Sequence, residues 1–222
     1  PYNDDEEFRP LIIFLHGGSF VSGSRTSSDI VELCTSYAKM GYVAVSIDYR
    51  LTTSLIFDGS EENAYLAVVK AIHDLKSAIR FFRKDDATEN NYNIDVDRIY
   101  AGGVSAGSIA AINAAYLNDE SEIPQFVINE VSEVGGIEGL SGNQDYDSNF
   151  FGIVNLCGAV GDIDWIGIDD TPIVSIHNTE DDVVPYSDQL VTLFGLNIQV
   201  YGSYKIHERM MELNNDSNLL SI

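Results

Sequence analysis

The chain has 222 residues, of which 45% are hydrophobic and 21% are charged, values typical of a globular protein with a substantial core and unlike those of a disordered chain. Acidic residues outnumber basic ones by 35 to 12, which gives a net charge of −23 and argues against binding to nucleic acid or to anionic membranes. The sequence contains no run of about 18 apolar residues, which is the pattern that predicts a membrane-spanning helix. An acidic surface is common in secreted proteins, and we expect a secreted or periplasmic location rather than a cytoplasmic one.

Short apolar runs alternate along the chain with segments of helical periodicity. The expected strands cover residues 11–15, 42–47, 98–101, 152–160 and 172–177, an extended stretch at 196–201, and a last strand that begins at Leu219. The expected helices cover residues 29–40, 61–82, 105–117 and 204–213, with an acidic linker at 83–97. This alternation predicts one α/β domain over residues 1–222, with a mostly parallel central sheet flanked by helices. Residues 123–150 are expected to form a small, irregular, lid-like excursion near the strand ends.

The two cysteines, Cys34 and Cys157, lie in apolar settings on different predicted elements. Their spacing is not that of metal ligands. We therefore interpret each as a small buried hydrophobic residue rather than as half of a disulfide.

One serine stands in a sharp, glycine-flanked turn between a predicted strand and a predicted helix. The sequence Gly103-Val104-Ser105-Ala106-Gly107 fits the G-x-S-x-G nucleophile elbow, in which a strained turn holds a serine hydroxyl up for attack. The pattern alone has low specificity, but its strand-turn-helix context is the one that the elbow requires. We predict that Ser105 is a nucleophile.

Three motifs follow one another in the order of a known family. The His16-Gly17-Gly18 loop, the elbow at Ser105 and the acidic turn Asp181-Asp-Val-Val-Pro185 resemble those of α/β-hydrolases of the carboxylesterase/lipase type. The similarity is greatest to hormone-sensitive-lipase-like and feruloyl-esterase-like bacterial enzymes. It implies an α/β-hydrolase fold and hydrolysis of carboxylic esters without a metal or an organic cofactor. Compared with the members of this family, we expect the chain to lack parts of both termini.

The resemblance implies an oxyanion hole beside Ser105. The Ala106 N–H and the N–H of Gly17 or Gly18 are its expected donors, because glycine lets the backbone approach a substrate carbonyl oxygen. Family members often have a third glycine where this chain has Ser19, which leaves the choice between Gly17 and Gly18 open. We expect His16 to organise the loop rather than to act as the base.

Asp181 is the predicted acid, because the family's turn places its aspartate four residues before the proline, here Pro185. The alternative is that Asp181 and its neighbours Glu180 and Asp182 are solvated turn carboxylates in a very acidic protein. His177, at the end of the preceding strand, is expected to cap that strand and to take no part in catalysis.

The catalytic base has two competing interpretations. The chain order Ser, Asp, His requires a histidine after Asp181, and His207 is the one that qualifies. However, helical spacing continues on both sides of His207, which places it in a helix and moves the base beyond Ile222, after the strand that begins at Leu219. We favour the second interpretation. His73, in the middle of the long predicted helix, is expected at the surface.

The sequence thus predicts a serine esterase that acts on a small-molecule or polymer-derived ester through an acyl-enzyme intermediate. The acidic surface favours a neutral substrate over an anionic one. The same triad also serves peptidases and amidases, and the same fold could act as a non-catalytic binding module. No nucleic-acid partner is expected, and the oligomeric state is left open.

Overall fold

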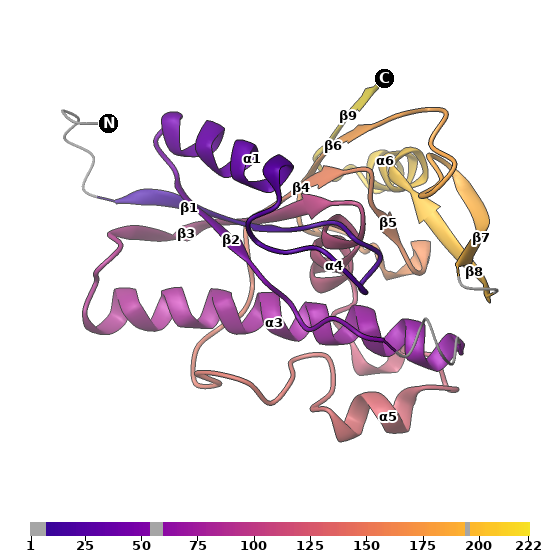
Figure 1. The fold of residues 1–222 in the computed structure, drawn as a ribbon, viewed down its shortest axis with the longest axis horizontal. Coiled ribbons are helices and arrows are strands. Elements are labelled where there is room, and N and C mark those ends of the chain that lie inside the picture. The colour runs from indigo at the N-terminus through magenta and orange to yellow at the C-terminus, as the bar shows by residue number, and fades with distance from the viewer. Residues whose placement is uncertain (1–7, 54–59, 194–195) are drawn as a thin grey trace.

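A six-stranded sheet forms the centre of the computed structural model, which describes residues 8–53, 60–193 and 196–222 (Figure 1). Its strand order is β2-β1-β3-β4-β6-β9, and each neighbouring pair is parallel. The strands are β1 (Arg9–Leu15), β2 (Val43–Ile47), β3 (Ile94–Val104), β4 (Gly152–Leu156), β6 (Ile173–His177) and β9 (Ser217–Ser221). The predicted α/β class with a mostly parallel sheet is confirmed.

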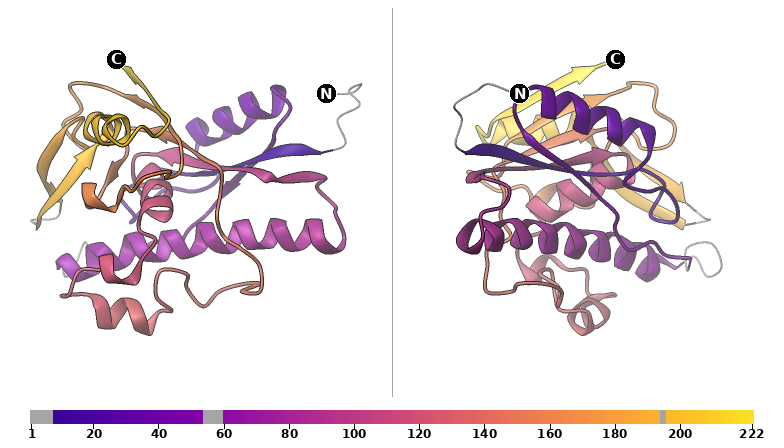
Figure 2. Two further views of the ribbon diagram at one scale, coloured as in Figure 1. Left: turned by 180° about the vertical axis from the view of Figure 1, so that it is seen from behind. Right: turned by 60° about the vertical axis from the view of Figure 1, so that its left-hand side comes forward.

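Helices cover both faces of this sheet (Figure 2). Successive side chains of β1 point to opposite faces, as the pleat of a strand requires. Ile12 and Phe14 pack with Ile30 of helix α1 (Ser28–Lys39). Leu11, Ile13 and Leu15 belong to the larger core cluster on the other face. Helices α3 (Glu61–Thr88), α4 (Ala106–Tyr116) and α6 (Ser203–Glu212) each contribute buried residues to that cluster.

A second, smaller sheet lies beside the first. It has the order β5-β8-β7 and consists of β5 (Ala159–Val160), β8 (Leu196–Gly202) and β7 (Asp188–Leu193), paired antiparallel. The strand expected at 152–160 is therefore wrong as one element: it breaks at Cys157, whose φ is 50°, and continues in the other sheet. The extended stretch at 196–201 likewise belongs to this antiparallel sheet.

Helix α3 is longer than expected. It continues to Thr88, and β3 begins at Ile94, so most of the linker predicted at 83–97 is regular structure. The turn between them is tied to Asp85, whose carboxylate accepts hydrogen bonds from the Asn91 side-chain amide (2.7 Å) and the Tyr92 backbone N–H (3.3 Å). None of the helices that the structure describes, α3 included, is both long and apolar enough to cross a membrane.

The irregular segment between α4 and β4 contains a 3₁₀ turn, η1 (Glu120–Glu122), and the short helix α5 (Ile128–Glu133). It is held against α3 by polar contacts. Glu138 bonds both Lys76 and Arg80, and the Nε2 atom of His73 lies 2.7 Å from the Gly136 carbonyl oxygen. The prediction that His73 lies at the surface is wrong, because this segment covers the ring and leaves the residue 1% exposed.

Candidate active site

Ser105 occupies the sharp turn between β3 and α4. Its backbone has φ 53° and ψ −119°, a sparsely populated conformation for a residue with a side chain and the one that a nucleophile elbow requires. The Ser105 N–H donates to the Leu156 carbonyl (2.9 Å), and the Ser105 carbonyl accepts from the Ile109 N–H (2.9 Å). These bonds fix the turn at the carboxyl edge of the sheet.

The two elbow glycines allow this turn to form. A Cβ atom on Gly103 would overlap the backbone of Gly107, and one on Gly107 would overlap the Leu15 carbonyl. Strand β1, strand β3 and helix α4 therefore meet here with backbone against backbone. The glycines in the motif are explained by close packing as well as by the turn.

The predicted oxyanion loop lies directly against the elbow. A Cβ atom on Gly17 would stand 3.6 Å from Ser105 Cβ. After it, Gly18, Ser19 and Phe20 have φ values of 122°, 53° and 62°, so Ser19 adopts a conformation that glycine adopts more readily. Ala106 is the first residue of α4, where a backbone N–H has no acceptor inside the helix.

His16 lies at the base of this loop and is buried. Its Nδ1 atom is 2.7 Å from the Gly17 carbonyl oxygen, and its ring stacks on Tyr49 at 4.3 Å between centroids. The Tyr49 hydroxyl donates to the His16 carbonyl at 2.9 Å. These contacts place His16 in the framework of the loop.

The turn after β6 holds Asp181 in a defined position. One carboxylate oxygen, Oδ1, accepts hydrogen bonds from the backbone N–H groups of Val183 (2.9 Å) and Val184 (3.0 Å). The Asp181 side chain is 18% exposed, whereas the neighbouring residues Glu180 and Asp182 are exposed. Asp181 thus differs from a freely solvated turn carboxylate.

His177, the last residue of β6, contacts this turn through its imidazole ring. Its Nδ1 atom lies 2.7 Å from Ser203 Oγ, and its Nε2 atom lies 3.0 Å from the Val184 carbonyl oxygen and 3.5 Å from Asp181 Oδ2. Burial lowers the pKa of His177 more than the contacts with Val184 and Asp181 raise it. A neutral, buried imidazole therefore joins β6 to the acidic turn.

The elbow and the acidic turn meet around Cys157, which follows β4. Burial raises the pKa of the Cys157 thiol, the adjacent Ser105 backbone lowers it, and the charge of Asp181 raises it further. The Cys157 N–H donates to the Ile176 carbonyl on β6 (3.0 Å), and the Ser105 N–H donates to the carbonyl of Leu156, the residue before Cys157, so Cys157 lies between the elbow and the end of β6. Both Cys157 and Cys34 are free thiols and half-buried.

A buried polar network connects the nucleophile helix with the acidic turn. Its centre is Asn155 on β4, which accepts from Ser108 Oγ (2.6 Å) and donates to Ser175 Oγ (2.9 Å) and Ser203 Oγ (2.8 Å). Ser203 in turn contacts His177. All five side chains are buried, so the network fixes α4, β6 and α6 relative to one another.

His207 lies elsewhere. It stands on α6 with its Nδ1 atom 2.9 Å from the hydroxyl of Ser217, the first residue of β9, which pairs with Ile173 at the start of β6. The other end of β9, Ser221, pairs with His177, about 13 Å further along the strand. The structure therefore holds His207 at the amino edge of the sheet, opposite the elbow, and does not bring it to Ser105.

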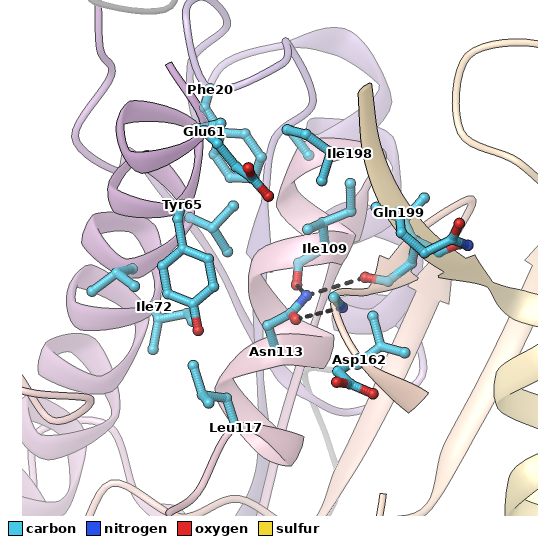
Figure 3. Close-up of a pocket in the computed structure, with 18 of the residues that line it drawn as sticks. Phe20, Glu61, Tyr65, Ile72, Ile109, Asn113, Leu117, Asp162, Ile198 and Gln199 are labelled. Carbon is cyan, nitrogen blue, oxygen red and sulfur yellow. Dashed lines mark hydrogen bonds between the residues drawn. The ribbon is translucent and has the colours of Figure 1, made fainter. Parts of the chain in front are cut away.

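Ser105 lines a cavity of about 330 Å³. Figure 3 shows other residues of its wall, among them Tyr65 and Ile109. Val183 and Val184 line it, so the elbow and the acidic turn share one cavity. Other parts of its wall were not predicted as site residues, namely Trp165 and the β8 residues 198–200. The apolar stripe of α3 also lines the cavity; its periodicity was visible in the sequence, but a stripe that packs in the core has the same pattern.

The chain is similar in sequence to a known family and to several known proteins. The BD-FAE family model matches residues 1–156. The chain is 31% identical over 108 residues to neutral cholesterol ester hydrolase 1 of Rattus norvegicus. This match covers 48% of this chain and 24% of that protein. It is 31% identical over 134 residues to esterase LipC of Mycobacterium tuberculosis. This match covers 59% of this chain and 30% of that protein. The matched segments thus cover less than a third of the length of these curated relatives.

The fold is that of a solved esterase. The apo form of Thermogutta terrifontis esterase 2 superposes with a TM-score of 0.67 at 21% identity, covering 99% of this chain and 75% of that one. The same enzyme phosphorylated by paraoxon superposes with a TM-score of 0.66. The predicted α/β-hydrolase fold is confirmed.

Proposed function

The chain belongs to the BD-FAE family, and from this premise we propose that it is a serine hydrolase that cleaves carboxylic esters through an acyl-enzyme intermediate. The observation that carries the proposal is Ser105, at φ 53° between β3 and α4, with a glycine loop against it and an acidic turn on the same cavity. The esterase names of the curated relatives support ester over amide bonds.

In the proposed reaction, the base takes the hydroxyl proton of Ser105 as Ser105 Oγ attacks the ester carbonyl carbon, and the negative charge moves to the carbonyl oxygen. The Ala106 N–H and the N–H of Gly17 or Gly18 stabilise this oxyanion, and one such donor contributes about 3 kcal/mol in the transition state. Collapse of the intermediate breaks the bond to the alcohol, which takes that proton from the base, and leaves the acyl group on Ser105. Water then gives a proton to the base as it attacks the acyl-enzyme, and the acid is released as Ser105 Oγ takes this proton back.

Asp181 is the proposed acid of the triad. Two backbone N–H groups hold its Oδ1 atom. Its Oδ2 atom, which lies 3.5 Å from His177 Nε2, would orient the imidazole of the base and stabilise the imidazolium that forms. Its partial burial favours this role over that of Glu180 and Asp182, which are exposed.

The proposed base is a histidine carried after β9 rather than His207. The Thr179 N–H donates to the Ile222 carbonyl (2.9 Å), and the Ile222 N–H donates to the His177 carbonyl (3.1 Å). Chain that leaves the sheet at this point therefore starts beside the acidic turn. His207, at the amino edge of β9, lacks this access.

The test is covalent labelling of the full-length protein with a fluorophosphonate, together with hydrolysis of p-nitrophenyl acetate. We expect labelling and turnover in the wild type, in His207→Ala and in Ser132→Ala, a control serine exposed on α5, and neither in Ser105→Ala. A folded full-length protein that is not labelled would instead indicate a binding module. Cleavage of amides but not esters would indicate a peptidase or amidase, and loss of activity in His207→Ala would restore His207 as the base.

A further inference from the structure

The cavity at Ser105 runs along the length of α4. Beyond Ser105 its wall on this helix is formed by Ile109, Asn113 and Leu117, each four positions from the last and so on one face. Three turns of helix separate its two ends, a depth of about 18 Å. The opposite wall is α3, which faces α4 across the cavity in Figure 3.

The walls are mostly apolar along this depth. The α3 side contributes Ala64, Val68 and Ile72, and Phe126 contributes to the wall beyond them. Asn113, the amide in the middle of the α4 wall, has its polar atoms occupied: Nδ2 donates to the Ile109 (2.7 Å) and Ala159 (3.1 Å) carbonyls, and Oδ1 accepts from the Gly161 N–H (3.0 Å). Apart from the Tyr65 hydroxyl, which also lines the cavity and has no hydrogen-bond partner among the described residues, a ligand here would meet mostly hydrocarbon.

The charges around the cavity are all of one sign. Glu61, Glu122 and Asp162 contribute to its lining, and among the described residues that line it there is no lysine, arginine or histidine. A chain that ends in a carboxylate or a phosphate would be repelled by these groups. The cavity therefore suits an uncharged chain.

The depth of the cavity and its volume both indicate the length of chain that it can hold. An extended chain of single bonds advances about 1.2 Å per bond, so a depth of about 18 Å takes up to about fifteen bonds. A cavity of about 150 Å³ holds benzene, with six carbons, so 330 Å³ corresponds to about twelve to thirteen carbons on that scale.

We propose that this cavity binds the acyl chain, and that the substrates are neutral esters of unbranched fatty acids of about ten to fourteen carbons. The inference rests on the proposed function, because Ser105 must carry the acyl group. A deep cavity beside the nucleophile suits the acyl group, which stays bound to Ser105 until water attacks, better than the alcohol, which must leave first.

The test is an acyl-length series of p-nitrophenyl esters from acetate to palmitate, measured on the full-length protein below the micelle concentration of each ester. We expect kcat/KM to rise about a hundredfold from acetate to decanoate or laurate, since each buried methylene adds to binding, and to fall at palmitate. A maximum at acetate or butyrate would overturn the proposal.

Two variants change the cavity itself. Val68→Phe fills its middle and should lower the ratio of kcat/KM for decanoate over acetate by about tenfold, whereas Val31→Phe, the same change at an exposed site on α1, should leave the ratio unchanged. Phe126→Ala, at a half-exposed site, should move the optimum to longer chains. An unchanged length profile in both cavity variants would contradict the proposal.

A comparison of ethyl decanoate with its isomer decyl acetate, both esters of unactivated alcohols, separates the two halves of the substrate. Preference for the long acyl chain supports the assignment, and preference for the long alcohol overturns it. These outcomes differ from a failure of the proposed function, in which no ester of any length is cleaved and Ser105 is not labelled.

Discussion

A methyl group on Gly17 would lie 3.6 Å from Ser105 Cβ and 3.3 Å from the Val104 carbonyl oxygen. These contacts are tight but do not overlap, so the fold can absorb Gly17→Ala with a shift of a few tenths of an ångström. Such a shift moves the proposed oxyanion donors, whose geometry governs the rate. We expect Gly17→Ala to lower kcat for ester hydrolysis by about tenfold or more, with little change in thermal unfolding.

Gly107→Ala is the matched change on the other side of the elbow. Its new methyl group would overlap the Leu15 carbonyl, which backbone movement alone can relieve. We expect a loss of about 3 kcal/mol or more in the free energy of unfolding, measured by urea denaturation. If Gly107→Ala were as stable as Gly17→Ala, the packing of β1 against α4 described above would be contradicted.

Asn155→Ala should destabilise the protein because it leaves several buried partners unpaired. The hydroxyls of Ser175 and Ser203 lose their donor, and Ser108 loses its acceptor. We expect a loss of about 3 kcal/mol in the free energy of unfolding. Asn178→Ala, which removes an exposed acceptor of the Glu180 N–H, should cost less than about 1 kcal/mol. Equal losses in the two variants would argue against the network.

Two tyrosines should respond in opposite directions to removal of the hydroxyl. Within the described part of the chain the buried Tyr65 hydroxyl has no hydrogen-bond partner, whereas the Tyr49 hydroxyl donates to the His16 carbonyl. Tyr65→Phe should therefore raise the free energy of unfolding by about 1 kcal/mol, and Tyr49→Phe should lower it by about 1 to 2 kcal/mol. Urea midpoints of both variants check this, and a loss in Tyr65→Phe would indicate a partner for its hydroxyl.

Stability should fall as the pH is lowered through the range in which histidine titrates. Burial lowers the pKa of both His73 and His177. The unfolded chain takes up protons on them near pH 6.5, whereas the folded protein takes them up only at lower pH, so acid favours the unfolded state below about pH 6.5. His73→Gln keeps a donor for the Gly136 carbonyl but does not titrate.

We expect the free energy of unfolding to decrease between about pH 7.5 and about pH 5.5, and to decrease less in His73→Gln. Urea denaturation at each pH measures both slopes. The site at His73 is separate from the proposed active site, so the comparison does not involve catalysis. Identical slopes in the two proteins would exclude His73 as a contributor.

The elbow could be predicted from the sequence because its constraints are local. Gly103, Ser105 and Gly107 stand within five residues. Close backbone packing requires the two glycines, and the proposed chemistry requires the serine. The break at Cys157 could not be predicted, because an apolar run gives no sign that a cysteine will adopt a positive φ. The end of α3 was missed for a related reason: residues 83–88 lack an apolar stripe, and the turn beyond them depends on Asp85 and its contacts with Asn91 and Tyr92.

The cavity was beyond sequence analysis because its walls come from segments far apart in the chain. Val68 and Ile109 read as ordinary core positions on two helices, and only their packing leaves space between them. The position of His207 also depends on how segments far apart in the chain pack together, which the sequence does not show. Chain order allowed it as a base, and its position relative to the edges of the sheet, set by the contact with Ser217, separates it from Ser105.

The backbone of Ser105 has φ 53° and ψ −119°, a conformation that the proposed reaction requires but that destabilises the folded protein. A residue with a side chain in such a conformation costs about 1 to 3 kcal/mol, and glycine would avoid most of that cost. Selection for heat resistance alone would therefore exchange Ser105 for glycine, and only selection for turnover would keep the serine.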